Sequence, residues 1–208
     1  FVASSLFAQD SDFDKGIEAY DQGNYTEAIS LYTNYIKKKK SANAYFNRGL
    51  ALYQNDEYIE AIEDFTIVLD LDPEDYEAWY NRGLSYYETG EFKKAYFDSE
   101  KAVLLNPEYG NSYTTIGLCF YNWKKYDKAV ESYTKSIILD KTANKYYHRA
   151  LAYQKLKDFS AAEKVLMEDA VFIILWYGED LALEQSFVRD FETNGIGYID
   201  LKKVFLYH

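Results

Sequence analysis

The chain has 208 residues, of which 48% are hydrophobic and 19% aromatic, and this composition excludes an intrinsically disordered protein. Its formal net charge of −11 excludes a nucleic-acid binder, because neutralising phosphates requires a basic surface. The same charge favours solubility and attracts basic partners, and no stretch approaches the ~18 apolar residues of a membrane span.

The N-terminal segment FVASSLFAQD is apolar and precedes a strongly acidic region. It resembles the end of a secretory signal peptide with cleavage after Ala8, which predicts a secreted or periplasmic protein. In the alternative interpretation, residues 1–8 are an apolar lead-in that caps the first repeat, and the protein is cytoplasmic. Both interpretations separate residues 1–8 from the rest of the chain.

Two kinds of small residue recur with a period of 34. The alanines are Ala61, Ala95 and Ala129, and a glycine lies twelve residues before each of them, at Gly49, Gly83 and Gly117. The two prolines of the chain, Pro73 and Pro107, are also 34 residues apart. A fixed period of this length indicates stacked structural repeats, and proline at their boundaries fits helical repeats because it breaks helix interiors.

Each repeat is predicted to contain two amphipathic helices, the A helix and the B helix, joined by a tight turn. In the second repeat we expect the A helix near residues 43–54 and the B helix near residues 58–71, because apolar residues recur there at helical spacing. Gly49 and Ala61 would let the two helices approach closely. The first and last repeats are less regular, as expected for the ends of a solenoid.

The pattern of aromatic residues, glycine, turn, alanine and closing proline resembles the tetratricopeptide repeat. The segment AWYNRGLSYYETGEFKKAYFDSEKAVLLNP, residues 78–107, matches it almost throughout. The resemblance covers five units, at residues 9–41, 42–75, 76–109, 110–142 and 143–176. It implies an all-α fold, a right-handed superhelix of antiparallel helix pairs. It also implies that the A helices line a concave groove that binds a peptide or a protein partner.

Tyrosines and asparagines of the A helices are the candidate groove residues. The predicted set is Tyr20, Phe46, Asn47, Tyr53, Tyr80, Asn81, Tyr87, Tyr121 and Tyr147. Tyrosine offers a large contact area at low entropic cost, and asparagine can hydrogen-bond a peptide backbone. The alternative is that these tyrosines pack between neighbouring A helices and that the asparagines are held by neighbouring repeats without a ligand.

Some tetratricopeptide domains hold a C-terminal carboxylate with lysine, asparagine and arginine side chains from three successive A helices. Only Asn47 of this chain matches that scheme, whereas Phe13, Ile17, Glu77 and Asn81 stand at the other four positions. We therefore expect no binding of the acidic C-terminal tails that those domains recognise.

The repeat pattern is lost in residues 177–208, which we expect to form an irregular tail or cap. Residues 186–205 resemble a single EF-hand, but Ile196 stands where an oxygen ligand is expected and Lys203 replaces the closing glutamate. Calcium takes six to eight oxygen ligands, so we favour a loop without calcium and expect no cofactor.

No catalytic motif is present, and two histidines with one cysteine make no credible zinc site, so we do not expect an enzyme. The sequence predicts a protein–protein interaction module of undetermined oligomeric state. Two alternatives remain. One is a structural subunit that assembles through its end faces, suggested by the apolar residues 170–177 and the lysines 37–40; the other is a calcium-responsive tail.

Overall fold

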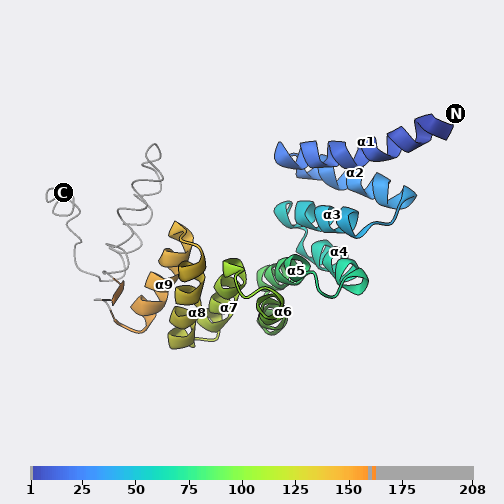
Figure 1. Ribbon diagram of the computed structural model, residues 1–208. Helices are drawn as coiled ribbons and strands as arrows, with labels where there is room; N and C mark the ends of the chain where they lie inside the picture. The colour runs from blue at the N-terminus through green and yellow to red at the C-terminus, as the bar shows by residue number, and fades with distance from the viewer. Residues whose placement is uncertain (1, 159–160, 163–208) are drawn as a thin grey trace, which may run out of the picture. The chain divides into compact units, whose positions relative to one another are not determined.

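The computed structural model describes residues 2–158 and 161–162, which form helices joined by short connections (Figure 1). The chain divides into two compact units, Phe1–Lys141 and Thr142–His208. The first unit contains α1 (Val2–Asp21), α2 (Tyr25–Lys38), α3 (Ala42–Gln54), α4 (Tyr58–Leu71), α5 (Tyr76–Glu88), α6 (Phe92–Leu105), α7 (Gly110–Asn122) and α8 (Tyr126–Leu139). The second unit contributes α9 (Ala143–Lys155).

The turn inside each helix pair has the same backbone conformation. One residue of the turn has a positive φ, which is 79° at Gly90, 62° at Asp56 and 60° at Lys124. This left-handed residue reverses the chain after the A helix, and its backbone N–H, like that of the next residue, bonds to carbonyls of the last turn of that helix. The conformation suits glycine best, yet aspartate and lysine adopt it in two of these turns.

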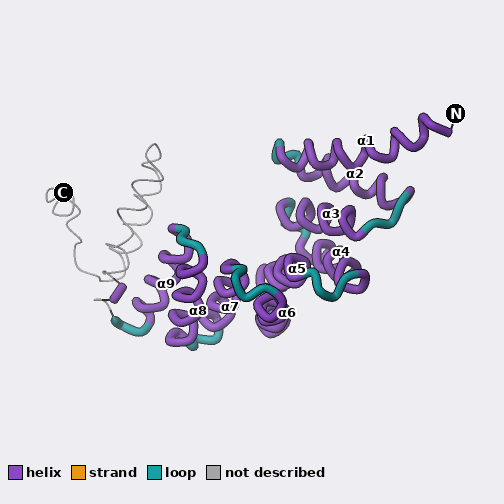
Figure 2. The backbone as a smooth tube through the Cα atoms, viewed as in Figure 1, coloured by secondary structure: helices purple, strands orange, loops and turns teal. Residues whose placement is uncertain are grey.

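Within the first unit, α1, α3, α5 and α7 are the A helices, and α2, α4, α6 and α8 are the B helices (Figure 2). Each A helix packs against its own B helix, and α3, α5 and α7 also pack against the B helix of the preceding pair. Neighbouring A helices also contact one another, whereas neighbouring B helices of this unit do not. The A helices therefore lie on the inner side of the stack. We call the surface that they share the inner face.

Small residues close the crossing of each helix pair. The repeating alanines Ala28, Ala61, Ala95 and Ala129 are fully buried. A β-carbon added to Gly49 would lie 2.9 Å from the ring of Phe65, and one added to Gly117 would lie 2.5 Å from the ring of Tyr133. Glycine is thus required because an aromatic side chain of the B helix, four residues after the alanine, occupies the space beside it.

The structure confirms the predicted all-α superhelical fold. The helices predicted near residues 43–54 and 58–71 are observed at Ala42–Gln54 and Tyr58–Leu71. The second helix of the fifth repeat, the apolar residues 170–177 and the EF-hand-like segment lie outside the described residues. None of the described helices is both long enough and apolar enough to cross a membrane.

Candidate functional site

The predicted groove tyrosines connect neighbouring A helices along the inner face. The hydroxyl of Tyr53 on α3 donates to Oε1 of Glu88 on α5 at 3.3 Å. The Asn122 amide on α7 donates to the Tyr87 hydroxyl at 2.9 Å, one repeat further along. In the first pair, Tyr20 has a hydrogen bond with the side chain of Gln54. Each hydroxyl therefore links one repeat to the next.

The rings of these tyrosines are held from the other side by the B helices. Each packs against the aromatic residue that begins the B helix of its own pair, with ring centroids between 5.3 and 5.4 Å apart. The pairs are Tyr20–Tyr25, Tyr53–Tyr58, Tyr87–Phe92 and Tyr121–Tyr126. All four tyrosines are half-buried, so they stiffen the stack and still reach its surface.

Most of the other predicted site residues contact their own helix, its partner B helix or the start of the next repeat. Phe46 packs edge-on against Phe65 at 5.7 Å, and Tyr80 packs against Tyr109 at 5.1 Å. The Asn81 amide donates to the backbone carbonyl of Glu77 on its own helix at 2.8 Å. Asn47 is half-buried. Tyr147 belongs to the second unit, where its ring lies 5.6 Å from that of His148.

Burial raises the pKa of several tyrosines above the ordinary value. It raises the pKa of Tyr32 to about 12. The pKa of Tyr53 is raised by burial and by the nearby Glu88 carboxylate, and that of Tyr80 by burial. For Tyr87 burial raises the pKa, while the hydrogen bond from Asn122 opposes the rise.

These pKa shifts predict a loss of stability in alkali. An unfolded tyrosine ionises near pH ~10, whereas the folded protein keeps these phenols protonated to higher pH. The raised pKa values therefore contribute stability that is complete below pH ~10 and is lost as the pH rises above it. Urea denaturation from pH 8 to 11 should show this fall, and the phenolate absorbance should rise at a higher pH in folded than in unfolded protein. Coincident absorbance curves would contradict the expectation.

Two half-buried arginines on the A helices form ion pairs with buried aspartates, which the sequence analysis missed. Arg48 donates through Nε and Nη2 to both carboxylate oxygens of Asp64 at 2.7 Å, and its Nη1 reaches Thr33 at 3.0 Å. Asp64 lies on the B helix of the same pair, whereas Thr33 lies on the B helix of the preceding pair. Burial raises the pKa of Asp64, and the hydrogen bond from Arg48 opposes that rise.

The same arrangement recurs one repeat later. Arg82 donates to the two oxygens of Asp98 at 2.7 and 3.1 Å and to Thr66 at 3.1 Å. We call each such arrangement an arginine clamp, because one guanidinium joins three helices. The signal was present in the sequence, since Arg48 and Arg82, and also the two aspartates, are 34 residues apart.

The clamps determine the charge of the inner face. Arg48 and Arg82 are the only cationic residues of α3, α5 and α7, and both are paired with aspartates of the B helices. The exposed charged residues on these three helices are Glu77 and Glu88. The inner face over α3, α5 and α7 is therefore acidic, with exposed amides at Gln54 and Asn122.

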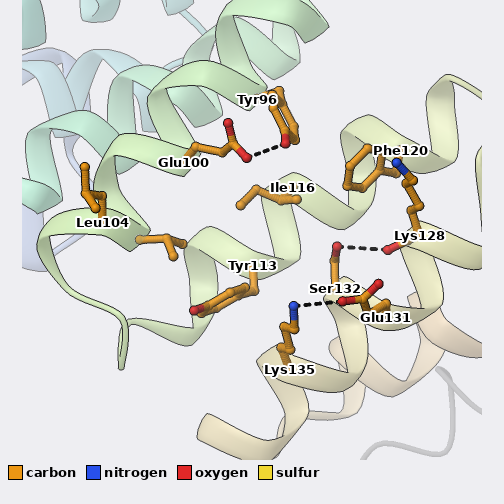
Figure 3. A pocket seen from close by; sticks show the side chains of 11 residues that line it. Tyr96, Glu100, Leu104, Tyr113, Ile116, Phe120, Lys128, Glu131, Ser132 and Lys135 are labelled. Atoms are coloured by element: carbon orange, nitrogen blue, oxygen red, sulfur yellow. Dashed lines mark hydrogen bonds and ion pairs between the residues drawn. The ribbon is translucent and has the colours of Figure 1, made fainter.

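A hollow of about 550 Å³ lies over α7 between α6 and α8, on the B-helix side (Figure 3). Its walls combine the rings of Tyr96, Tyr113 and Phe120 with aliphatic side chains and the charged groups of two glutamates and two lysines. Ile116 lies in the hollow and is nearly buried, at 8% exposure. No cluster of histidine, cysteine or carboxylate side chains suited to a metal occurs among the described residues.

Family profiles match most of the chain. Those described as tetratricopeptide repeat match residues 13–65, 76–109, 110–142 and 145–168, and one described as TPR repeat matches residues 51–90. A search among curated proteins gave no significant match.

Several solved structures share the fold at low sequence identity. MamA from Desulfovibrio magneticus RS-1 superposes with a TM-score of 0.70 at 20% identity, covering 77% of this chain and 92% of that one. The thermophilic TPR protein TTC0263 of Thermus thermophilus gives 0.71 at 16% identity, covering 87% and 97%. The Sgt2 TPR domain from Aspergillus fumigatus gives 0.55 at 23%, covering 59% and 83%.

The family consists of non-enzymatic interaction and scaffold proteins, which agrees with the lack of a catalytic motif. A protein–protein interaction module is therefore supported by the repeats and by the fold together. From its repeats, its helix pairs and these matches, the chain belongs to the tetratricopeptide repeat family.

Proposed function

We propose that the protein binds an extended, basic segment of a partner protein along the inner face. The observation that carries this proposal is the charge of that face, where α3, α5 and α7 expose glutamates and amides but no unpaired cation. A basic segment would meet complementary charge there, and electrostatic complementarity favours specificity and fast association.

The tyrosine contacts support the same surface. Tyr20, Tyr53 and Tyr87 are fixed by ring packing on one side and by a hydrogen bond to the next A helix on the other. A surface ordered before binding loses less side-chain entropy when a partner docks. The half-buried rings would supply apolar contact beside the polar groups of Gln54 and Asn122.

The spacing of the repeats also determines which residues of a bound segment would be contacted. Packed helices are separated by about 8–10 Å, and an extended chain advances about 3.3 Å per residue. Successive repeats would therefore contact roughly every third residue of the bound segment. This spacing predicts a partner in which basic or amide-bonding residues recur at that interval.

Charge reversal tests the proposal without disturbing the core. Glu77 and Glu88 are exposed, and the only hydrogen bond between repeats that the change removes in the described part of the chain is the 3.3 Å bond from the Tyr53 hydroxyl to Glu88, so the double variant Glu77→Lys with Glu88→Lys should still fold. We expect capture of partners from an extract of the source organism, quantified by mass spectrometry, to fall at least about tenfold, because like charges at an interface cost several kcal/mol. Raising the salt concentration should weaken capture by the unmodified protein as well.

The matched control reverses two exposed glutamates of α4, on the B-helix side. Glu60→Lys with Glu63→Lys changes the net charge equally but leaves the inner face intact. The control should capture the same partners as the unmodified protein. Equal losses in the two double variants would mean that net charge, and not the inner face, governs binding.

A further inference from the structure

The second arginine clamp shows what surrounds a guanidinium in this fold. Besides Asp98 and Thr66, Arg82 contacts two rings: its Cζ lies 4.7 Å from the ring centroid of Trp79 and 5.9 Å from that of Tyr86. The side chain is thus held by a carboxylate, a hydroxyl and two aromatic rings.

The hollow occupies the equivalent place one repeat later. Arg82 and the four residues around it each have an equivalent residue 34 positions later in the sequence. The equivalents are Ile116 for Arg82, Ser132 for Asp98, Glu100 for Thr66, Tyr113 for Trp79 and Phe120 for Tyr86. All five of these later residues line the hollow (Figure 3). In the clamp the carboxylate lies on the B helix of the same pair and the hydroxyl on the B helix of the preceding pair, whereas in the hollow these two positions are reversed. A carboxylate, a hydroxyl and two rings are nevertheless all present. Only the guanidinium is missing, because isoleucine carries none.

The charged groups at the rim leave room for a cation. Lys135 is paired with Glu131 at 2.8 Å. Glu100 accepts a hydrogen bond from the Tyr96 hydroxyl and forms no ion pair with any residue in the described part of the chain. Its carboxylate can therefore accept a further charged donor.

A lysine already beside one ring does not exclude a guanidinium. Lys128 lies 5.6 Å from the centroid of Phe120, as Lys94 lies 4.9 Å from that of Tyr86 one repeat earlier. In that earlier repeat, Arg82 contacts the same Tyr86 ring although Lys94 is present. The earlier repeat therefore accommodates both cations around one ring.

We propose that the hollow between α6 and α8 receives an arginine side chain presented by a protein partner, which completes a third clamp in trans. Arginine fits better than lysine because its planar guanidinium stacks on rings and donates to a carboxylate through two parallel bonds. The site lies on the B-helix side and is therefore distinct from the inner face.

The binding test uses N-acetylarginine methylamide as the probe and N-acetylcitrulline methylamide as the neutral control. In ¹H–¹⁵N spectra of the full chain, the arginine probe should shift amides around Glu100, Ile116 and Ser132, and citrulline should not. Glu100→Gln should weaken the probe about fivefold or more, as expected for a charge-assisted bond, whereas Glu60→Gln should not. Equal shifts from both probes, or shifts confined to the inner face, would overturn the proposal.

A second measurement needs no added ligand. Ile116→Arg places the guanidinium in the hollow from within, so we expect an unchanged or raised melting temperature and loss of probe binding. The same substitution combined with Glu100→Gln should melt at a clearly lower temperature. A large fall in Tm for Ile116→Arg alone would show that the hollow does not suit a guanidinium. A concentration-dependent dimer that Ile116→Arg abolishes would assign the hollow to a second copy and also overturn the proposal.

Discussion

Replacing Asp98 with alanine is expected to lower the free energy of unfolding by about 3–5 kcal/mol, the range observed when one partner of a buried ion pair is removed. The side chain of Asp98 is 3% exposed, and its two oxygens accept both bonds from Arg82. Without the carboxylate, the guanidinium between α4, α5 and α6 would keep only the Thr66 hydroxyl and the flanking rings. Urea denaturation followed by circular dichroism measures the loss.

Two further variants separate the ion pair from a general effect of removing an acid. Asp70→Ala removes an exposed carboxylate of α4 and should change stability by less than about 0.5 kcal/mol. Arg82→Met combined with Asp98→Leu should recover most of the loss, because replacing both ions by apolar groups removes the unpaired charge. A loss below about 1 kcal/mol in Asp98→Ala would show that the clamp does not hold the repeats together.

The second large effect is expected for Gly117→Ala, which should destabilise the protein by about 1–3 kcal/mol through overpacking. The new β-carbon would lie 2.5 Å from Cε1 of Tyr133, whose side chain is fully buried and cannot turn aside freely. This is the opposite of the usual effect, since alanine in a helix is ordinarily favoured over glycine by about 1 kcal/mol.

A double-mutant cycle assigns that loss to the contact with Tyr133. In a Tyr133→Leu background the ring is gone, so Gly117→Ala should cost much less than it does in the unmodified protein. Gly83→Ala is the matched control, because its β-carbon would meet Ala95 and Asp98 at 3.2 Å instead of 2.5 Å. Equal losses for the two glycines, or no coupling with Tyr133, would contradict the packing that we describe.

The sequence predicted the helix pairs accurately because their spacing follows from close packing. Small residues stand where two helices cross, since the alanines are fully buried and a β-carbon on Gly49 or Gly117 would collide with a ring, so their period marks the crossing directly. The ring opposite each glycine could not be assigned in the same way. In the third pair, Ser99 stands at the position of this ring. A β-carbon on Gly83 would therefore meet the backbone carbonyl of Ala95, the Asp98 side chain and the Ser99 hydroxyl instead of a ring.

The candidate site was less predictable, because sequence position does not reveal a side chain's partner. The register of Tyr53 and Tyr87 predicts that they lie on the A-helix surface, but it does not reveal that their hydroxyls meet Glu88 and Asn122 on the next repeat. The arginine clamps were readable from the period, since an arginine and an aspartate recur together. The hollow could not be predicted from the sequence. The change from Arg82 to Ile116 one repeat later shows that a cation is absent, but it does not show that an open space takes its place.

Photo-cross-linking shows directly which face of the stack touches the partner. A photoreactive amino acid placed at Glu88, on the inner face, is compared with the same group at Glu63, on the B-helix side and distant in sequence from the hollow. Irradiation in an extract of the source organism should cross-link a partner protein from position 88 and none from position 63. The same partner cross-linked from position 63 and not from position 88 would contradict binding along the inner face.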